Sequence, residues 1–278
     1  MIGAGPAHTL RLLERFIALE WLKLRRSRTF KAILITMAAT PAVALLTLSW
    51  LEGNPIVFLR VLEAIGAFLV VLGTFSALLL TATVLGSEFE QGTVRVIIEH
   101  GIPRWMFIAG KGSALIVAAA LSALAGWFCS GIAAVISHIS QAGTRILLLG
   151  ILGLCTSGLD TILIVVLMVA AYVGLTTIVG VLTRSTAFTM FGGLGLFMAD
   201  LLANGDLGFE FNLGQFSTFS IFHNAVALLN KLQFTMAPLS LIAGGKFETQ
   251  PATAAAILLA YALGGFTVAI LIFQRQDL

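Results

Sequence analysis

The residues in this chain best suited to chemistry are a glycine-lysine element, two isolated acids and a serine among small residues. Gly110-Lys111-Gly112-Ser113 is similar to the end of a phosphate-binding loop. However, Trp105 occupies the position where such a loop needs its first glycine, the serine is displaced by one residue, and no strand pattern precedes it. The sequence therefore predicts no ATP site on this chain, and Lys111 is interpreted as a positive anchor of the helix that follows.

Asp160 and Asp200 border long apolar segments. A carboxylate at the centre of a bilayer costs about 2.5–3.5 kcal/mol, so acids placed there tend to be functional. Both are predicted near the outer ends of their helices, where the cost is small, and the favoured interpretation is an exposed boundary acid. An ion relay would need partners deeper in the membrane, which the sequence does not supply.

The remaining nucleophiles and metal ligands form no recognisable site. Ser157 lacks the preceding glycine of a rhomboid-type protease, and the last apolar segment has no histidine base. The histidines show no metal-ligand spacing, and both cysteines lie in apolar sequence as small core residues (His8, His100, His138, His223, Cys129 and Cys155). We predict no catalytic, cofactor-binding or metal-binding residue, and no enzymatic activity.

Composition indicates a membrane protein. Hydrophobic residues make up 59% and charged residues 10% of the 278 residues, with a mean hydropathy of +1.03, whereas soluble domains carry about 25% charged residues. The net charge of +3 does not indicate nucleic-acid binding, because Lys and Arg cluster beside apolar segments. We predict an all-α integral membrane protein, a single transmembrane domain over residues 1–278. Its six transmembrane helices are expected near 32–51, 64–86, 112–137, 161–183, 187–202 and 253–273.

The positive charges predict the orientation. With a cytoplasmic N-terminus, twelve of the 16 Lys and Arg residues fall inside and four fall outside (Arg60, Arg145, Lys231 and Lys246). Cytoplasmic segments of membrane proteins carry such an excess. Both termini and the segment 87–111 are therefore predicted to be cytoplasmic.

Residues 9–31 have the pattern of a helix lying along the membrane surface. Apolar residues recur on one side at helical spacing, interrupted by Glu20 (Leu13, Phe16, Ile17, Trp21 and Leu24), and basic residues occupy much of the rest (Arg11, Arg15, Arg25 and Arg26). We predict an interfacial helix whose basic side faces anionic lipid headgroups. A plain basic anchor that only fixes topology is the alternative.

The most charged segment, 87–111, separates two uncharged runs long enough to cross a bilayer, 64–86 and 112–137. It must therefore lie in water. We predict a short helix over Thr93–Glu99, a break at residues 101–103, and a second helix from Arg104. Such an elbow can transmit force from a soluble partner, and a solvated loop is the alternative.

Two outer segments do not fit simple spans. Residues 139–160 contain Arg145 and only a short apolar stretch, which predicts an interfacial or re-entrant piece. Residues 203–250 are rich in phenylalanine, including Phe219 and Phe222, and are expected to fold back onto the membrane as re-entrant or interfacial helices.

The elbow resembles the membrane subunits of type-2 ATP-binding-cassette (ABC) exporters. Those subunits have an acidic-Gly-Thr element after the second span, then a Pro-Ser-Arg-like turn and a Gly-Lys pair before the third. Here the matching residues are Glu88, Gly92-Thr93, Pro103-Arg104 and Gly110-Lys111, and the serine between Pro and Arg is missing. The interfacial helix, the six spans and the Arg184-Ser185 element extend the resemblance over the chain.

The resemblance implies a non-catalytic permease subunit in the plasma membrane of a prokaryote. Its partners would be two copies of an ABC ATPase subunit, which would hold ATP and magnesium, a second permease copy or paralogue, and membrane lipid. The segment 87–104 would dock on the ATPase and the helix 9–31 would contact it from the side. The implied coupling residues are Glu88, Glu90, Gly92, Thr93, Arg95, Pro103 and Arg104.

The substrate path is expected to be lined by apolar and aromatic side chains with few charges, which favours an amphipathic drug, peptide or lipid-like molecule over a free ion; polysaccharide export is a further alternative. Two alternatives act without an ATPase: an ion-coupled secondary transporter and a membrane immunity protein. The first would need membrane-embedded ion ligands and usually inverted repeats, which the sequence does not show.

Overall fold

The computed structural model describes residues 6–52, 58–142, 145–203, 219–232 and 250–276, and these residues form helices and short connections without a strand. In chain order the helices are α1 (Pro6–Arg26), α2 (Arg28–Glu52), α3 (Phe58–Thr81), a π-helical turn η1 (Ala82–Gly86), α4 (Ser87–Glu90), α5 (Thr93–Glu99), α6 (Arg104–Ala142), α7 (Arg145–Thr183), α8 (Thr186–Ala203), α9 (Ile221–Leu232) and α11 (Pro251–Arg275). The predicted all-α membrane fold is confirmed.

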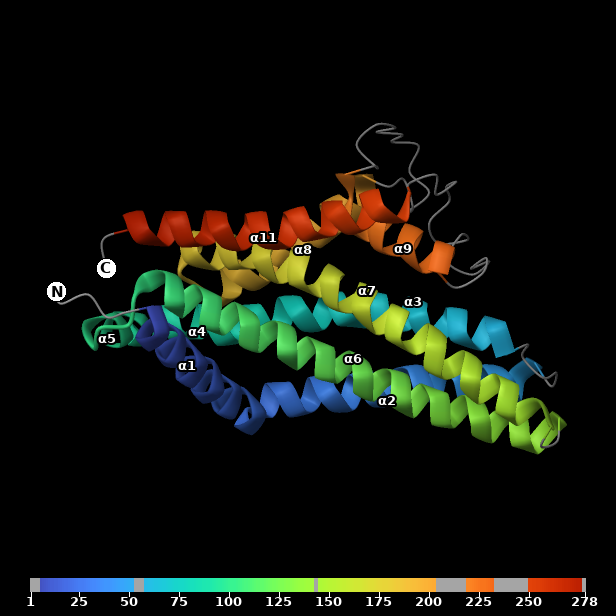
Figure 1. The fold of residues 1–278 in the computed structure, drawn as a ribbon. Coiled ribbons are helices and arrows are strands. Elements are labelled where there is room, and N and C mark those ends of the chain that lie inside the picture. The colour runs from blue at the N-terminus through green and yellow to red at the C-terminus, as the bar shows by residue number, and fades with distance from the viewer. Residues whose placement is uncertain (1–5, 53–57, 143–144, 204–218, 233–249, 277–278) are drawn as a thin grey trace.

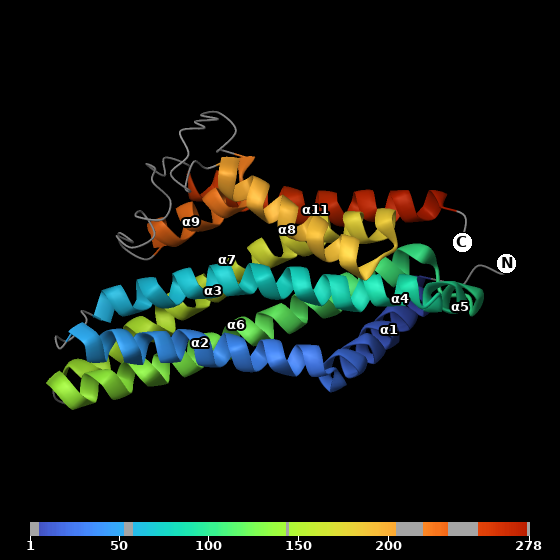
Figure 2. The same cartoon turned by 180° about the vertical axis from the view of Figure 1, so that it is seen from behind.

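The long helices run roughly alongside one another, and α7 packs against α3, α6, α8, α9 and α11 (Figures 1 and 2). A close backbone approach joins α7 to α11. A Cβ on Gly265 would lie 2.7 Å from the carbonyl carbon of Gly174, so both backbones need glycine at this crossing. The start of α1, helix α5 and the end of α11 lie at one end of the molecule, which we call the elbow end.

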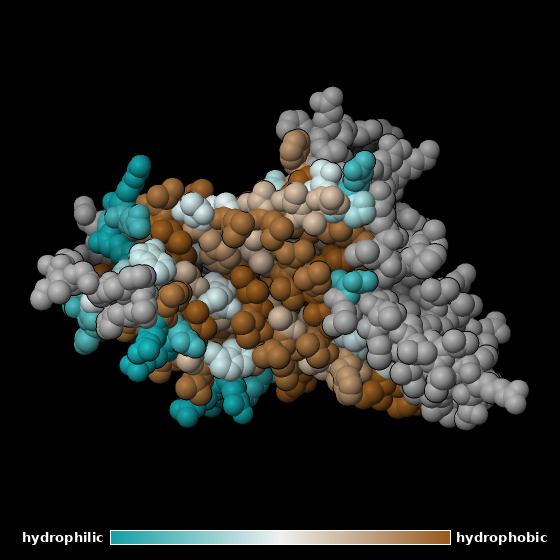
Figure 3. Space-filling model, viewed as in Figure 1, coloured by the Kyte–Doolittle hydropathy of each residue, from teal (hydrophilic) through white to brown (hydrophobic). Residues whose placement is uncertain are grey.

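Four helical segments are long and apolar enough to cross a membrane, judged on the described residues: Leu69–Glu90, Arg104–Ala133, Asp160–Thr183 and Pro251–Arg275. A shorter apolar helix covers Thr186–Leu202. Apolar side chains cover the middle of the surface and hydrophilic ones gather at the elbow end (Figure 3). The expected span at 32–51 lies in α2, which is not among the four; part of its C-terminal end lies outside the residues whose side chains are described.

Two boundaries differ from those expected. The helix predicted over 9–31 is divided at Ser27, whose hydroxyl accepts a hydrogen bond from the backbone N–H of Phe30 at 3.1 Å and so caps α2. Helix α1 turns away from α2 at this point (Figure 2). The prediction of a separate interfacial or re-entrant piece at 139–160 is wrong, because α6 continues to Ala142 and α7 is continuous from Arg145. Most of the outer segment 203–250 lies outside the described residues.

Candidate coupling site

The elbow is a helix-turn-helix-turn-helix segment whose two turns depend on glycine. Gly92 has φ +68° and Gly101 has φ +86°, values that side-chain-bearing residues rarely adopt. Between them α5 covers the residues expected to form a short helix. The Thr93 hydroxyl donates to the backbone carbonyl of Glu88 at 3.1 Å, which ties the first turn together. Pro103 then precedes α6, where a missing backbone N–H does no harm.

A four-membered charge cluster joins the elbow to α1. The Lys111 ammonium on α6 lies 2.7 Å from Glu20 Oε2 on α1 and 2.8 Å from Glu88 Oε1 on α4. Lys23 lies 2.8 Å from Glu20 Oε1 and 3.7 Å from Glu88 Oε1. Glu20 and Lys111 are 3% and 1% exposed, Glu88 is 16% exposed and Lys23 is 58% exposed. The interior of the cluster is therefore one lysine between two carboxylates.

The electrostatics of the cluster favour charged groups. Burial raises the pKa of the Glu20 carboxyl, but Lys111 and Lys23 outweigh that effect and hold this pKa below its ordinary value. Burial lowers the pKa of Lys23, and its contacts with Glu20 and Glu88 more than offset that, so its pKa is raised. Within the described structure, Glu88 Oε2 is buried without a hydrogen-bond partner. The buried charges of Glu20 and Lys111 thus depend on their ion-pair partners for their stability.

Gly110 allows α1 to pack closely against α6. A Cβ at this position would lie 2.3 Å from Cδ1 of Phe16, so only glycine lets the Phe16 ring lie against α6. Phe16 belongs to an apolar cluster with Val94 of α5, Phe107 of α6 and Phe273 of α11. The adjacent Gly110 and Lys111 therefore both hold α1, one through close packing and the other through charge.

Glu90 attaches the elbow to α8. Its carboxylate accepts hydrogen bonds from the Ser185 hydroxyl at 2.9 Å, the Thr186 backbone N–H at 2.7 Å and the Thr186 hydroxyl at 2.9 Å. The carboxylate therefore caps the N-terminus of α8, where unpaired N–H groups and the helix dipole favour negative charge. Gly86 permits the contact, because a Cβ there would lie 2.6 Å from Thr186 Cα.

Arg104 attaches the elbow to α11. Its guanidinium donates to the backbone carbonyls of Phe273 at 3.1 Å and Gln274 at 3.0 Å, and also to that of Gln276. It also lies 5.9 Å from the centroid of the Phe273 ring. A cation at the last carbonyls of a helix complements its dipole. Arg104, the first residue of α6, thus connects α6 to the C-terminal end of α11.

The sequence matches a family model described as ABC-2 family transporter protein over residues 16–278. The chain belongs to the ABC-2 transporter family. It is a multi-pass transmembrane subunit of an ABC transporter, and its family implies an ABC ATPase subunit as partner. The sequence matched no curated protein.

The predicted coupling residues of this ABC-2 subunit fall into two groups. Glu88, Glu90 and Arg104 contact other helices and hold α1, α8 and α11, with Glu90 itself exposed. Gly92, Thr93, Arg95 and Pro103 are exposed on the elbow. The exposed group shares its surface with Val96, 50% exposed, and with Glu99, which pairs with Arg95 at 2.9 Å.

In α1, which covers most of the predicted interfacial helix, the predicted apolar side packs on the protein. Phe16 and Leu24 are buried, and Trp21 makes an edge contact with Phe30 at 5.7 Å between ring centroids. The predicted basic residues are exposed (Arg11, Arg15, Arg25 and Arg26).

Two residues of the ABC-2 site were misinterpreted from the sequence. Lys111 is more than the positive anchor of the helix that follows, because its ammonium is buried between the carboxylates of Glu20 and Glu88. Glu20 does not simply interrupt the apolar arc of α1; it lies on the buried side, four residues from both Phe16 and Leu24. The sequence signal for this ion pair was an acid, Glu20, on the apolar side of a helix and a lysine, Lys111, between two glycines.

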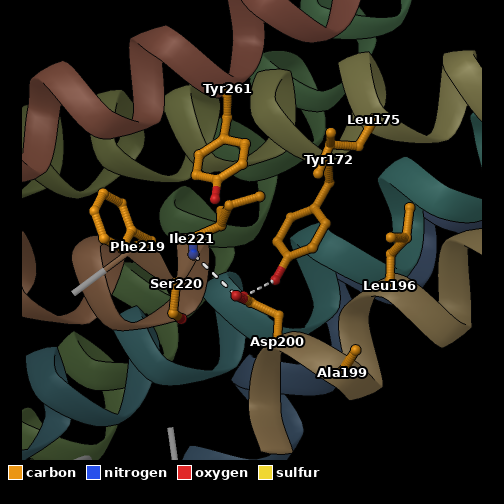
Figure 4. Close-up of a pocket in the computed structure, with 9 residues that line it drawn as sticks. All are labelled: Tyr172, Leu175, Leu196, Ala199, Asp200, Phe219, Ser220, Ile221 and Tyr261. Carbon is orange, nitrogen blue, oxygen red and sulfur yellow. Dashed lines mark hydrogen bonds between the residues drawn. The ribbon is translucent and has the colours of Figure 1, made fainter. Parts of the chain in front are cut away.

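The interpretation of Asp200 as an exposed boundary acid is wrong. It is half-buried and lines a cavity of about 390 Å³ (Figure 4). Its carboxylate accepts hydrogen bonds from the Tyr172 hydroxyl at 2.5 Å and from the backbone N–H groups of Ile221 at 3.0 Å and Phe222 at 2.9 Å. Asp200 lies three residues before the end of α8 at Ala203, where α9 packs against it.

Proposed function

We propose that this subunit is the permease of an ATP-driven exporter in the plasma membrane of a prokaryote. Two copies, or this chain and a paralogue, enclose the substrate path, and each engages one of two separate ATPase subunits, which hold ATP and magnesium. Both termini and the elbow face the cytoplasm. The permease itself is non-catalytic, and its substrate is amphipathic.

The observation that carries this proposal is that one surface of the elbow is exposed while the other contacts three helices. Its outer surface, formed by Thr93, Arg95, Val96 and Glu99, is exposed at the end of the molecule. Its inner surface is fixed by Glu88 and Lys111 to α1, by Glu90 to α8 and by Arg104 to α11. A force applied to α5 therefore reaches three helices through charged contacts.

Helix α1 supports a second contact, with lipid. On the arc that carries Arg11, Arg15 and Arg26, it also exposes leucines (Leu12, Leu19 and Leu22). This mixture suits the headgroup region, where guanidinium groups meet phosphates and apolar side chains enter the acyl boundary.

The experiment compares two charge reversals at the elbow end. Arg95→Glu changes the exposed surface of α5, and Arg275→Glu makes the same change at the end of α11, outside the elbow. With a tagged permease expressed together with its transporter genes, Arg95→Glu should reduce the ATPase recovered at least several-fold, and Arg275→Glu should not. Equal recovery from wild type and Arg95→Glu, or no ATPase recovered with wild type, would contradict the proposal.

A further inference from the structure

The cavity beside Asp200 lies part-way along the apolar helices α7 and α11. Tyr172 is 11 residues from the end of α7 at Thr183, and Tyr261 is 14 residues from the end of α11 at Arg275. At 1.5 Å per residue these positions lie about 17 and 21 Å from the elbow end of their helices, inside a hydrocarbon layer of about 30 Å. A carboxylate is costly at this depth and commonly marks a ligand or ion pathway.

The chemistry of the lining is acidic, aromatic and apolar. Among the described lining residues, Asp200 carries the only formal charge, and no lysine or arginine is present. The hydroxyl group of Tyr172 points at the Asp200 carboxylate, to which it donates, and the ring of Tyr261 points towards the same region from α11 (Figure 4). Leu175, Leu196 and Phe219 supply apolar surface, and Phe219 is 61% exposed.

These properties exclude two classes of ligand. An anion would meet the Asp200 carboxylate, which already occupies the positive N-terminal end of α9. A metal ion would need several ligands, and no group of three or more His, Cys, Asp or Glu residues suitable for one occurs in the described part of the chain. An organic cation matches both features: its charge is attracted to the carboxylate in a low dielectric, and aromatic rings favour a cation beside them.

We infer that this cavity binds the cationic group of an amphipathic organic molecule, with Asp200 facing the charge and Tyr261 and Phe219 beside it. That such a ligand is the transported substrate rests on the proposed function, whereas the preference of the cavity for a cation does not. The 390 Å³ volume accommodates a body of several rings.

The test measures equilibrium binding to the purified full-length chain in nanodiscs of zwitterionic lipid, without ATPase. The probe is tetraphenylphosphonium, and tetraphenylborate serves as a ligand of nearly the same shape and opposite charge. Wild type should bind the cation at least tenfold more tightly than the anion. Asp200→Asn should lose at least tenfold in cation affinity and should gain or keep affinity for the anion.

Four further variants keep the test independent of folding defects at Asp200, which also caps α9. Phe219→Ala, at an exposed position, should weaken cation binding several-fold. Tyr261→Phe, which keeps the ring, should weaken it less than Tyr261→Ala. Asp160→Asn removes an acid outside the cavity and should bind as wild type does.

Equal affinity of wild type for cation and anion would overturn the inference, as would unchanged cation binding in both Asp200→Asn and Phe219→Ala. The binding test contains no ATPase, so its outcome is independent of the ATPase-recovery experiment. If the chain binds the cation selectively but recovers no ATPase, the assignment of the cavity stands and only the proposed function is refuted. ATPase recovery without selective cation binding would give the reverse result.

Discussion

At the residue scale, Lys111 is the centre of the charge cluster because it faces carboxylates from two other elements. Glu20 and Glu88 lie within 2.8 Å of its ammonium, and Lys23 provides a second, more exposed cation. Removing one member of a buried pair leaves an uncompensated charge, which costs about 3–5 kcal/mol. Exposed pairs contribute less than about 1 kcal/mol.

Lys111→Met should therefore lower the thermal midpoint of the purified subunit strongly, with a loss of about 3 kcal/mol or more in the free energy of unfolding. Lys23→Met removes the same charge from a 58% exposed position and should cost at most about 1 kcal/mol. Thermal unfolding in detergent measures both. Similar midpoints for the two variants would show that the buried ammonium has no special role.

The cluster also predicts a pH dependence. The pKa of Glu20 is lowered from 4.5 in the folded chain, so the unfolded state binds this proton more readily. The stability that Glu20 contributes is therefore complete well above pH 4.5 and is lost as pH falls through the lowered pKa. The difference in midpoint between wild type and Glu20→Gln should stay constant from pH 7 to about 5.5 and shrink below that. A difference that grows on acidification would contradict this sign.

At the element scale, α1 is held on α6 by two adjacent residues with different roles. Lys111 supplies charge, whereas Gly110 supplies space for the Phe16 ring. The same pattern recurs where Glu90 caps α8 and Gly86 admits Thr186. Close packing and charge therefore act together at both junctions, so each junction is expected to move as a unit.

Gly110→Ala should destabilise the subunit by about 1–3 kcal/mol, because the new methyl group overlaps Phe16. Adding Phe16→Leu should restore part of the loss. Gly264→Ala on α11 is the matched control, since a Cβ there meets nothing within 4 Å. Its midpoint should equal or exceed that of wild type, because alanine favours the helix. Equal destabilisation by both alanines would contradict the close contact at Gly110.

Local patterns predicted some of these elements and missed others. Thr93–Glu99 was predictable because glycine and proline bound it on both sides. The continuous α7 was not, since Arg145 and a short apolar stretch suggested a separate piece. The roles of Glu20 and Asp200 depend on partners 91 and 21 residues away in the chain, at Lys111 and Ile221, and no local pattern reveals such contacts.

At the scale of the whole molecule, the subunit separates two kinds of site. The elbow end carries exposed charge and the contacts that tie the elbow to α1, α8 and α11. The cavity beside Asp200 lies deeper, among α7, α8, α9 and α11. Helices α8 and α11 contact both sites, so a displacement of the elbow would reach the cavity through them.

The most direct test of the coupling role is a cross-link from α5. A single cysteine at Thr93, in a chain with Cys129 and Cys155 replaced by serine, would be treated with a short bifunctional reagent in native membranes. We expect a cross-linked product that contains the ATPase subunit, and no labelling of this cysteine by membrane-impermeant thiol reagents in intact cells. Labelling from outside intact cells without any ATPase cross-link would contradict both the orientation and the coupling role of the elbow.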